Sequence, residues 1–164
     1  MKKFFLGLVL LATAAASSAQ FIDNGPSRAL PGKTQPVEFL FPEQVTVPAD
    51  KPTTIPLHFR VAPGLHVNSH QPHDEFLIPT VFSIPEGKGA RLVSAVYPEG
   101  VDVVLPADPK MKLNVYTGNF EITARIIAEA GNHLVEAKLR YQACDQTQCM
   151  PPKTIPVVIN VVGK

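Results

Sequence analysis

Tryptophan is absent from this sequence of 164 residues, and cysteine occurs only as Cys144 and Cys149. A pair this close in sequence excludes the cross-sheet disulfide of antibody domains, which packs on a tryptophan. Their spacing also differs from the Cys-x-x-Cys motif of thioredoxin-type enzymes. The formal net charge is +1, and basic residues do not cluster beyond Lys2 and Lys3. A nucleic-acid partner is therefore not expected.

Long apolar runs are also scarce, and the one that stands out covers residues 4–16, directly after Lys2 and Lys3. With about thirteen residues it is shorter than the roughly 20 that a membrane-spanning helix needs. Small residues follow, ending in Ala19, as a signal peptidase site requires. We predict a signal peptide over residues 1–19, cleaved after Ala19, rather than a retained anchor. Prolines interrupt every later apolar stretch, so no membrane span is expected in the mature chain.

The remaining sequence divides into a leader and one domain. Residues 20–35 contain Asn-Gly-Pro and Pro-Gly turn signals and little apolar periodicity, which predicts a flexible leader. Residues 36–164 consist of short β-like runs separated by proline and glycine. No Ser-His-Asp arrangement, phosphate-binding glycine loop or pair of catalytic carboxylates stands out in them.

Strict alternation of apolar and polar residues predicts three long strands, 53–61, 119–127 and 133–141. Their expected inward faces are Ile55, Leu57, Phe59 and Val61; Phe120, Ile122, Ala124 and Ile126; and Val135, Ala137, Leu139 and Tyr141. Residues 130–132 between the last two strands suggest a hairpin turn. Five shorter strands are predicted at 37–41, 80–84, 91–97, 112–116 and 155–162. The expected fold is an all-β, immunoglobulin-like antiparallel β-sandwich of about eight strands.

The two cysteines of an exported chain would meet an oxidising compartment, where a disulfide is the expected resting state. The four polar residues between them, 145–148, suit a turn that brings the two Cα atoms within the usual 4.4–6.8 Å. Such a short loop contributes only about 2 kcal/mol in the chain-entropy model. Asp145 is adjacent to Cys144 and disfavours its thiolate, so a strongly acidic thiol is not indicated. These features leave a structural and a redox-active disulfide both open.

The run Tyr-Gln-Ala-Cys, four residues, Cys-Met-Pro-Pro at residues 141–152 resembles the active-site segment of the N-terminal periplasmic domain of the thiol:disulfide interchange protein DsbD. Residues 64–68, 77–80 and 115–118 follow the order and spacing that such domains show. The resemblance covers roughly residues 37–162. It implies an immunoglobulin-like domain whose cysteine pair passes reducing equivalents in the periplasm, as a protein-disulfide reductase-type activity or an electron relay.

By position in this resemblance, Cys149 forms the mixed disulfide with partners and Cys144 resolves it. Thioredoxin-fold periplasmic proteins are the implied partners, and no metal or organic cofactor is implied. DsbD chains continue into membrane helices whereas this sequence stops at Lys164, so a separate membrane electron donor is expected. The family also covers its disulfide with a loop that presents an aromatic ring. The aligned segment here, residues 98–110, has no aromatic residue, although Tyr97 and Tyr116 flank it.

Three further interpretations remain open. His66, His70 and His73, followed by Asp74 and Glu75, have the residue types of a copper or zinc site. Met150 beside the two cysteines suggests a periplasmic copper-binding module, because thiolates and thioethers suit Cu(I). A structural immunoglobulin-like interaction module with a static disulfide is the other alternative.

Overall fold

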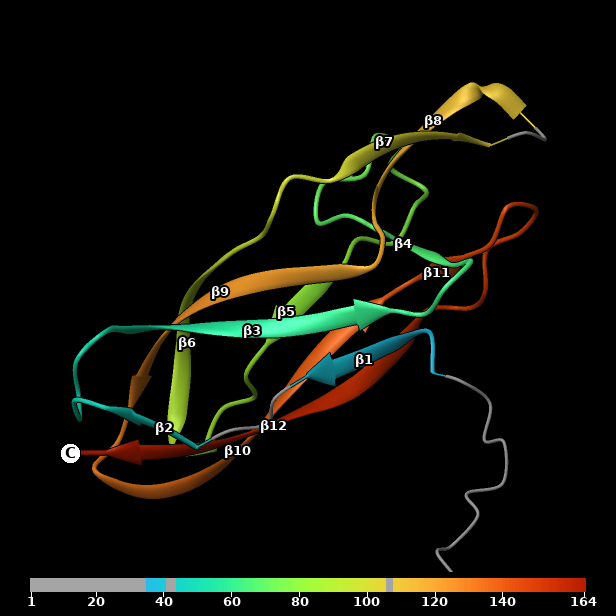
Figure 1. The fold of residues 1–164 in the computed structure, drawn as a ribbon. Coiled ribbons are helices and arrows are strands. Elements are labelled where there is room, and N and C mark those ends of the chain that lie inside the picture. Colours follow the sequence, from blue (N-terminus) through green and yellow to red (C-terminus); the bar gives the residue numbers. More distant parts are fainter. Residues whose placement is uncertain (1–34, 41–43, 106–107) are drawn as a thin grey trace, which may run out of the picture. The chain divides into compact units, whose positions relative to one another are not determined.

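The computed structural model of the chain describes residues 35–40, 44–105 and 108–164, which form strands and no helix (Figure 1). In this part of the chain no apolar helix reaches the length needed to cross a membrane. The predicted signal peptide (1–19) and leader (20–35, except for its last residue) lie outside the described residues. The twelve strands are β1 (Val37–Leu40), β2 (Gln44–Val47), β3 (Thr53–Val61), β4 (His66–Asn68), β5 (Val81–Ser83), β6 (Ala90–Val96), β7 (Val101–Leu105), β8 (Asp108–Tyr116), β9 (Asn119–Ala128), β10 (Gly131–Tyr141), β11 (Ala143–Cys144) and β12 (Lys153–Gly163).

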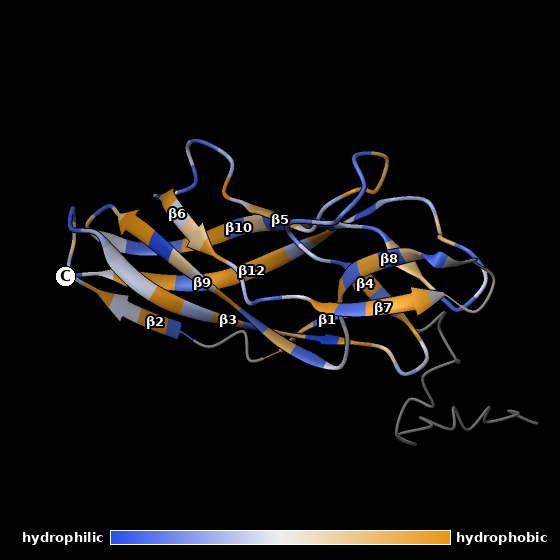
Figure 2. Ribbon diagram, turned by 90° about the horizontal axis from the view of Figure 1, so that it is seen from above, coloured by the Kyte–Doolittle hydropathy of each residue, from blue (hydrophilic) through white to orange (hydrophobic). Residues whose placement is uncertain are grey.

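The first sheet has the order β1-β3-β9-β6, and all its neighbours are antiparallel. Because side chains alternate along a strand, β3 and β9 each bury one apolar face. The eight inward residues predicted for these two strands are all buried. Figure 2 shows the alternation in β9 as successive blue and orange bands.

The second sheet has the order β2-β12-β10-β5. The strands β10 and β12 pair along their whole length, from Gly131 opposite Gly163 to Tyr141 opposite Lys153. The four inward residues predicted for β10 are fully buried. The strands β2 and β12 run parallel, with Val45 opposite Val161, so the sheet is mixed rather than purely antiparallel.

The hairpin turn predicted at residues 130–132 is wrong, because β9 and β10 do not pair. Residues 129–130 lie between these two strands. They join β9 of the first sheet to β10 of the second. The backbone N–H of Glu129 donates to the carbonyl of Gly89 at 2.9 Å, which ties the turn to the start of β6. At Gly131 the backbone has a φ of 111°, a conformation that favours glycine. The sequence signalled a turn here, but not the change of sheet.

One cluster of buried apolar side chains, drawn from strands of both sheets, fills the interior. Phe59 lies within it, fully buried, with its ring centroid 5.3 Å from those of Phe39 and Phe120. Two four-stranded sheets packed on one core are the architecture of a β-sandwich. The predicted all-β, immunoglobulin-like fold is confirmed, with twelve strands in the described residues where the sequence indicated eight.

A third, smaller sheet with the order β11-β4-β8-β7 lies at one end of the sandwich (Figures 1 and 2). Three of its strands, β4, β7 and β11, were not predicted, and neither was β2 of the second sheet. In this sheet β4 pairs with β8 on one side and with β11 on the other. The small sheet therefore positions the segment that carries the cysteines.

Candidate functional site

Cys144 and Cys149 form a disulfide with an S–S distance of 2.04 Å, as predicted. Cys144 ends β11, and Cys149 faces it as an isolated antiparallel bridge. Two backbone hydrogen bonds flank the pair, Asp145 N to Gln148 O at 2.9 Å and Met150 N to Ala143 O at 2.8 Å. The cysteines are thus a non-hydrogen-bonded pair, the position in which opposite Cα atoms come closest. Their Cα atoms lie 3.9 Å apart, closer than the usual range.

The turn between the cysteines is organised by the carboxylate of Asp145. Its Oδ1 accepts hydrogen bonds from the Thr147 N–H at 2.7 Å, the Thr147 hydroxyl at 2.8 Å and the Gln148 N–H at 2.8 Å. These bonds, led by the one from the Thr147 N–H, lower the pKa of Asp145. The polar turn expected from the sequence therefore forms as an Asx-type turn.

Replacing Asp145 with alanine is expected to remove hydrogen-exchange protection from the Thr147 and Gln148 amides. Asp145→Asn keeps the acceptor oxygen and should therefore retain most of the hydrogen-exchange protection. Because folding lowers the pKa of this carboxyl, its contribution to the turn is present above the usual aspartate pKa and is lost as the pH falls through the lowered value. Amide exchange followed by NMR checks this, and equal protection in wild type and Asp145→Ala would contradict it.

The two bonded cysteines differ in exposure. Cys144 has no exposed surface, whereas Cys149 is exposed. Pro151 and Pro152, which follow Cys149 after the half-buried Met150, are exposed as well. Thiol–disulfide exchange begins with attack by a thiolate on an accessible sulfur. Of the two cysteines, Cys149 is therefore the one that solvent reaches.

Gln142 links the cysteine segment to its surroundings, and sequence reasoning gave it no role. Its Oε1 accepts hydrogen bonds from Asn68 Nδ2 at 3.1 Å and from the Ile78 N–H at 3.2 Å. Its Nε2 donates to the Met150 carbonyl at 3.3 Å. Asn68 Nδ2 donates also to the Ile78 carbonyl at 3.1 Å. One amide thus joins β4, the segment after it and the residue that follows Cys149.

His66 lies opposite Cys144 in the pairing of β4 with β11. The residue is buried, and its Nε2 has no hydrogen-bond partner among the described residues. Burial lowers the pKa of His66, and the nearby Asp145 carboxylate opposes this shift. The imidazole beside the disulfide is therefore held toward its neutral form.

The three histidines of the metal hypothesis have different partners. His66 lies against β11, His70 Nδ1 is 2.9 Å from the Thr80 carbonyl, and His73 Nε2 is 2.8 Å from Asp102 Oδ1. Among the described residues no three His, Cys, Asp or Glu side chains are grouped as a metal would require. The close spacing of these histidines in the sequence does not bring them together in the fold.

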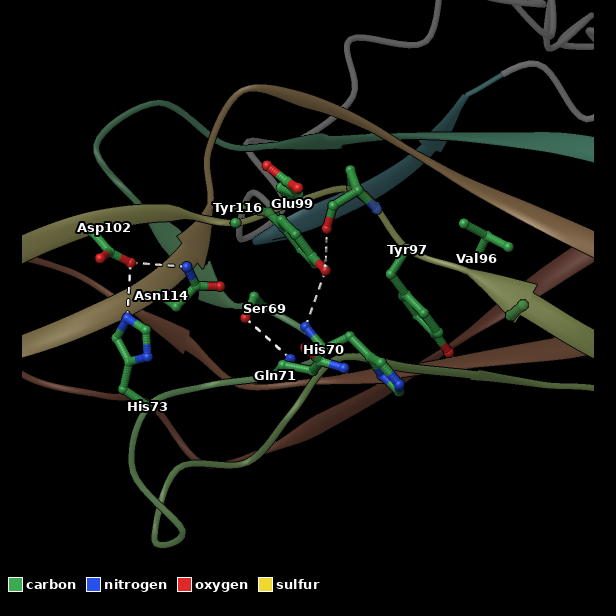
Figure 3. A pocket seen from close by; sticks show the side chains of 13 residues that line it. Ser69, His70, Gln71, His73, Val96, Tyr97, Glu99, Asp102, Asn114 and Tyr116 are labelled. Atoms are coloured by element: carbon green, nitrogen blue, oxygen red, sulfur yellow. Dashed lines mark hydrogen bonds and ion pairs between the residues drawn. The ribbon is translucent and has the colours of Figure 1, made fainter.

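Tyr97 and Tyr116, which flank the segment aligned with the family's covering loop, line an open polar cavity with His70 (Figure 3). The rings of His70 and Tyr97 stack, with centroids 3.7 Å apart. The Tyr116 hydroxyl accepts a hydrogen bond from the His70 N–H at 3.0 Å and donates one to the Pro98 carbonyl at 3.1 Å. Burial raises the pKa of Tyr116, and the bond from His70 opposes this. Both rings are fixed in the cavity wall.

The segment aligned with the covering loop, residues 98–110, mostly forms strands. It contains β7 and the first residues of β8, and 106–107 lie outside the described residues. Residues 70–79 contact the cysteine segment, because the Ile78 N–H donates to Gln142 Oε1 at 3.2 Å. Phe76 in that segment is 84% exposed.

A family model and a solved structure are similar to this chain. The family model described as thiol:disulfide interchange protein DsbD, N-terminal, matches residues 36–159. Among solved structures, the DsbD N-terminal domain of Neisseria meningitidis in its reduced form is similar, with a TM-score of 0.47 and 17% sequence identity over 70% of this chain and 82% of that one. No curated protein matched the sequence. The chain belongs to the family of DsbD N-terminal domains, as its cysteine segment indicated.

Proposed function

We propose that this chain is a periplasmic relay that passes reducing equivalents to partner proteins through Cys144 and Cys149. The family functions in thiol–disulfide exchange. The observation that carries the proposal is the difference in exposure within one disulfide, since Cys149 is exposed and Cys144 is buried. An exposed cysteine beside a buried one suits a bridge that is opened from one side.

In the loading step, a thiolate of the electron donor attacks the Sγ of Cys149 and breaks the bond to Cys144, which leaves as a thiolate and takes up a proton. The second donor thiolate then attacks the donor sulfur of this mixed disulfide and releases Cys149. The donor becomes a disulfide and the chain a dithiol, so two electrons and two protons have been transferred.

In the delivery step, the Cys149 thiolate attacks a disulfide of the acceptor and forms a new mixed disulfide. Cys144 then loses its proton and attacks the Sγ of Cys149, which restores the intramolecular bridge. The acceptor leaves as a dithiol. Thioredoxin-fold periplasmic proteins are the proposed acceptors, and a separate membrane protein is the proposed donor.

The reduction potential of the Cys144–Cys149 pair tests the proposal. An exchanging pair is expected above about −300 mV, whereas structural disulfides lie below that value. Equilibration in dithiothreitol buffers, followed by alkylation and mass spectrometry, measures it. Approach from both the oxidised and the reduced protein is the control for equilibrium. A potential below about −300 mV would favour the alternative of a static disulfide in an interaction module.

A further inference from the structure

We propose that His66 accepts the proton of the Cys144 thiol when Cys144 attacks the mixed disulfide at Cys149. This inference rests on the proposed exchange function and assigns a proton-transfer group within it. Three observations support it: the strand register, the burial of the ring and the unpartnered Nε2.

The register places His66 and Cys144 side by side on one face of the small sheet. They are directly opposite in the antiparallel pair of β4 and β11, where Cβ atoms lie roughly 4.5–5.5 Å apart. The next residues, Val67 and Ala143, belong to the apolar core and thus point to the other face. Beyond them, the side chains of Asn68 and Gln142 are hydrogen-bonded to each other. The alternation leaves His66 beside Cys144.

The ring of His66 is nearly enclosed, with 8% of the residue exposed, and its Nε2 finds no partner among the described residues. A buried polar atom without a hydrogen bond is costly, and each such case in a native protein needs an explanation. In the disulfide, Cys144 carries no proton. On reduction Cys144 gains an S–H donor across the strand pair, and we expect this thiol to become the partner of the His66 nitrogen.

The charges around His66 suit a proton acceptor. Burial lowers the pKa of His66, which favours the neutral imidazole, the form that can accept a proton. The groups of β11 and its turn that face His66 are Cys144 and the Asp145 carboxylate. The carboxylate stabilises the imidazolium once His66 is protonated. From β8, Tyr116 pairs with Val67 and so lies on the opposite face.

In the resolving step, the proton and the electron pair can both be accounted for. The Cys144 S–H gives its proton to Nε2 as its sulfur bonds to the Sγ of Cys149. The bond from Cys149 to the acceptor breaks, and the electron pair leaves with the acceptor sulfur as a thiolate. Release of the proton from the imidazolium to solvent restores His66.

The test uses 5,5′-dithiobis(2-nitrobenzoate) as the acceptor disulfide and follows thionitrobenzoate release by stopped flow. Attack by Cys149 releases the first thionitrobenzoate, and resolution by Cys144 releases the second. We expect His66→Phe and His66→Gln to leave the first phase unchanged and to slow the second at least about tenfold at pH 7. Gln can accept a hydrogen bond but not a proton, so it separates proton transfer from filling of the site. His58→Gln, in the half-exposed part of β3, is the matched control and should keep both phases.

The pH profile of the second phase gives an independent readout. In wild type the rate of the second phase should rise with pH as His66 loses its proton. In the variants it should rise only at higher pH, where the Cys144 thiol itself loses its proton. An unchanged second phase and profile in both variants would overturn the role of His66. Absence of the first phase in wild type would instead contradict exchange at Cys149. The experiment therefore distinguishes failure of the His66 role from failure of the proposed function.

A measurement on the wild-type protein covers the case in which the variants fail to fold. NMR titration of the histidine rings is expected to show a different midpoint for His66 in the reduced and oxidised proteins. His58 serves as the internal reference. The same midpoint for His66 in both states would overturn the inference.

Discussion

Cys144→Ser is expected to accumulate a covalent complex with an oxidised thioredoxin-fold protein. The exposed Cys149 can still attack the partner disulfide, but without the Cys144 thiol the mixed disulfide cannot go on to reduced partner, and only the partner's second thiol can return it to the starting proteins. Cys149→Ser should form little complex, because Cys144 has no exposed surface. Non-reducing gels and intact mass of the trapped species measure the difference.

The double variant Cys144→Ser/Cys149→Ser controls for non-covalent association and should give no band that reductant removes. Equal trapping by the two single variants would contradict the conclusion, drawn from the unequal exposure of the two cysteines, that Cys149 is the one that reacts with partners. Trapping by neither would favour a static disulfide and agree with a low reduction potential.

Phe59→Ala is expected to lower the free energy of unfolding by about 3–5 kcal/mol, a large part of the stability of a typical domain. Phe59 has no exposed surface, and its ring packs between Phe39 and Phe120 on the neighbouring strands of the first sheet. Removing the ring leaves a cavity that the paired backbones of β1, β3 and β9 cannot close. Urea unfolding followed by circular dichroism measures the loss.

Phe76→Ala is the matched control, since this ring is 84% exposed. The same chemical change should alter the free energy of unfolding by less than about 0.5 kcal/mol. A similar loss in both variants would show that Phe76 is packed in solution. A loss under 1 kcal/mol for Phe59→Ala would contradict the position of the ring at the centre of the core.

The long strands could be predicted because the alternation of apolar and polar residues is clear over nine or more residues. In β3, for example, the buried residues follow a strict period of two. The strands β4 and β11 have three and two residues, too few to show a period. The parallel pair of β2 and β12 joins segments far apart in the sequence, and no local pattern encodes such a partner. The wrong hairpin prediction at residues 130–132 has the same cause, since a turn signal does not say which sheet receives the next strand.

In the candidate site, too, local features could be predicted from the sequence and features that depend on tertiary pairing could not. The disulfide and its polar turn depend on neighbours in sequence, so spacing and residue type were sufficient to predict them. Gln142 and Asn68 are 74 positions apart, and their hydrogen bond exists only because β4 lies beside β11. His66 was visible to sequence reasoning as one of three spaced histidines, but its neighbour is Cys144, and the register that decides this is set by tertiary pairing.

The hydrogen bonds that flank the cysteines belong to the main chain, so breaking the S–S bond does not in itself remove them. The reduced hairpin then keeps Cys144 next to Cys149 even while a partner is attached. Groups held in this way react with an effective molarity that can reach roughly 10⁵ M or more, far above any free thiol. The lifetime of the covalent complex is therefore set by the hairpin and not by the concentration of thiols in the compartment. In the relay proposed above, the partner would therefore be released on an intramolecular timescale, before competing thiols can divert the electrons.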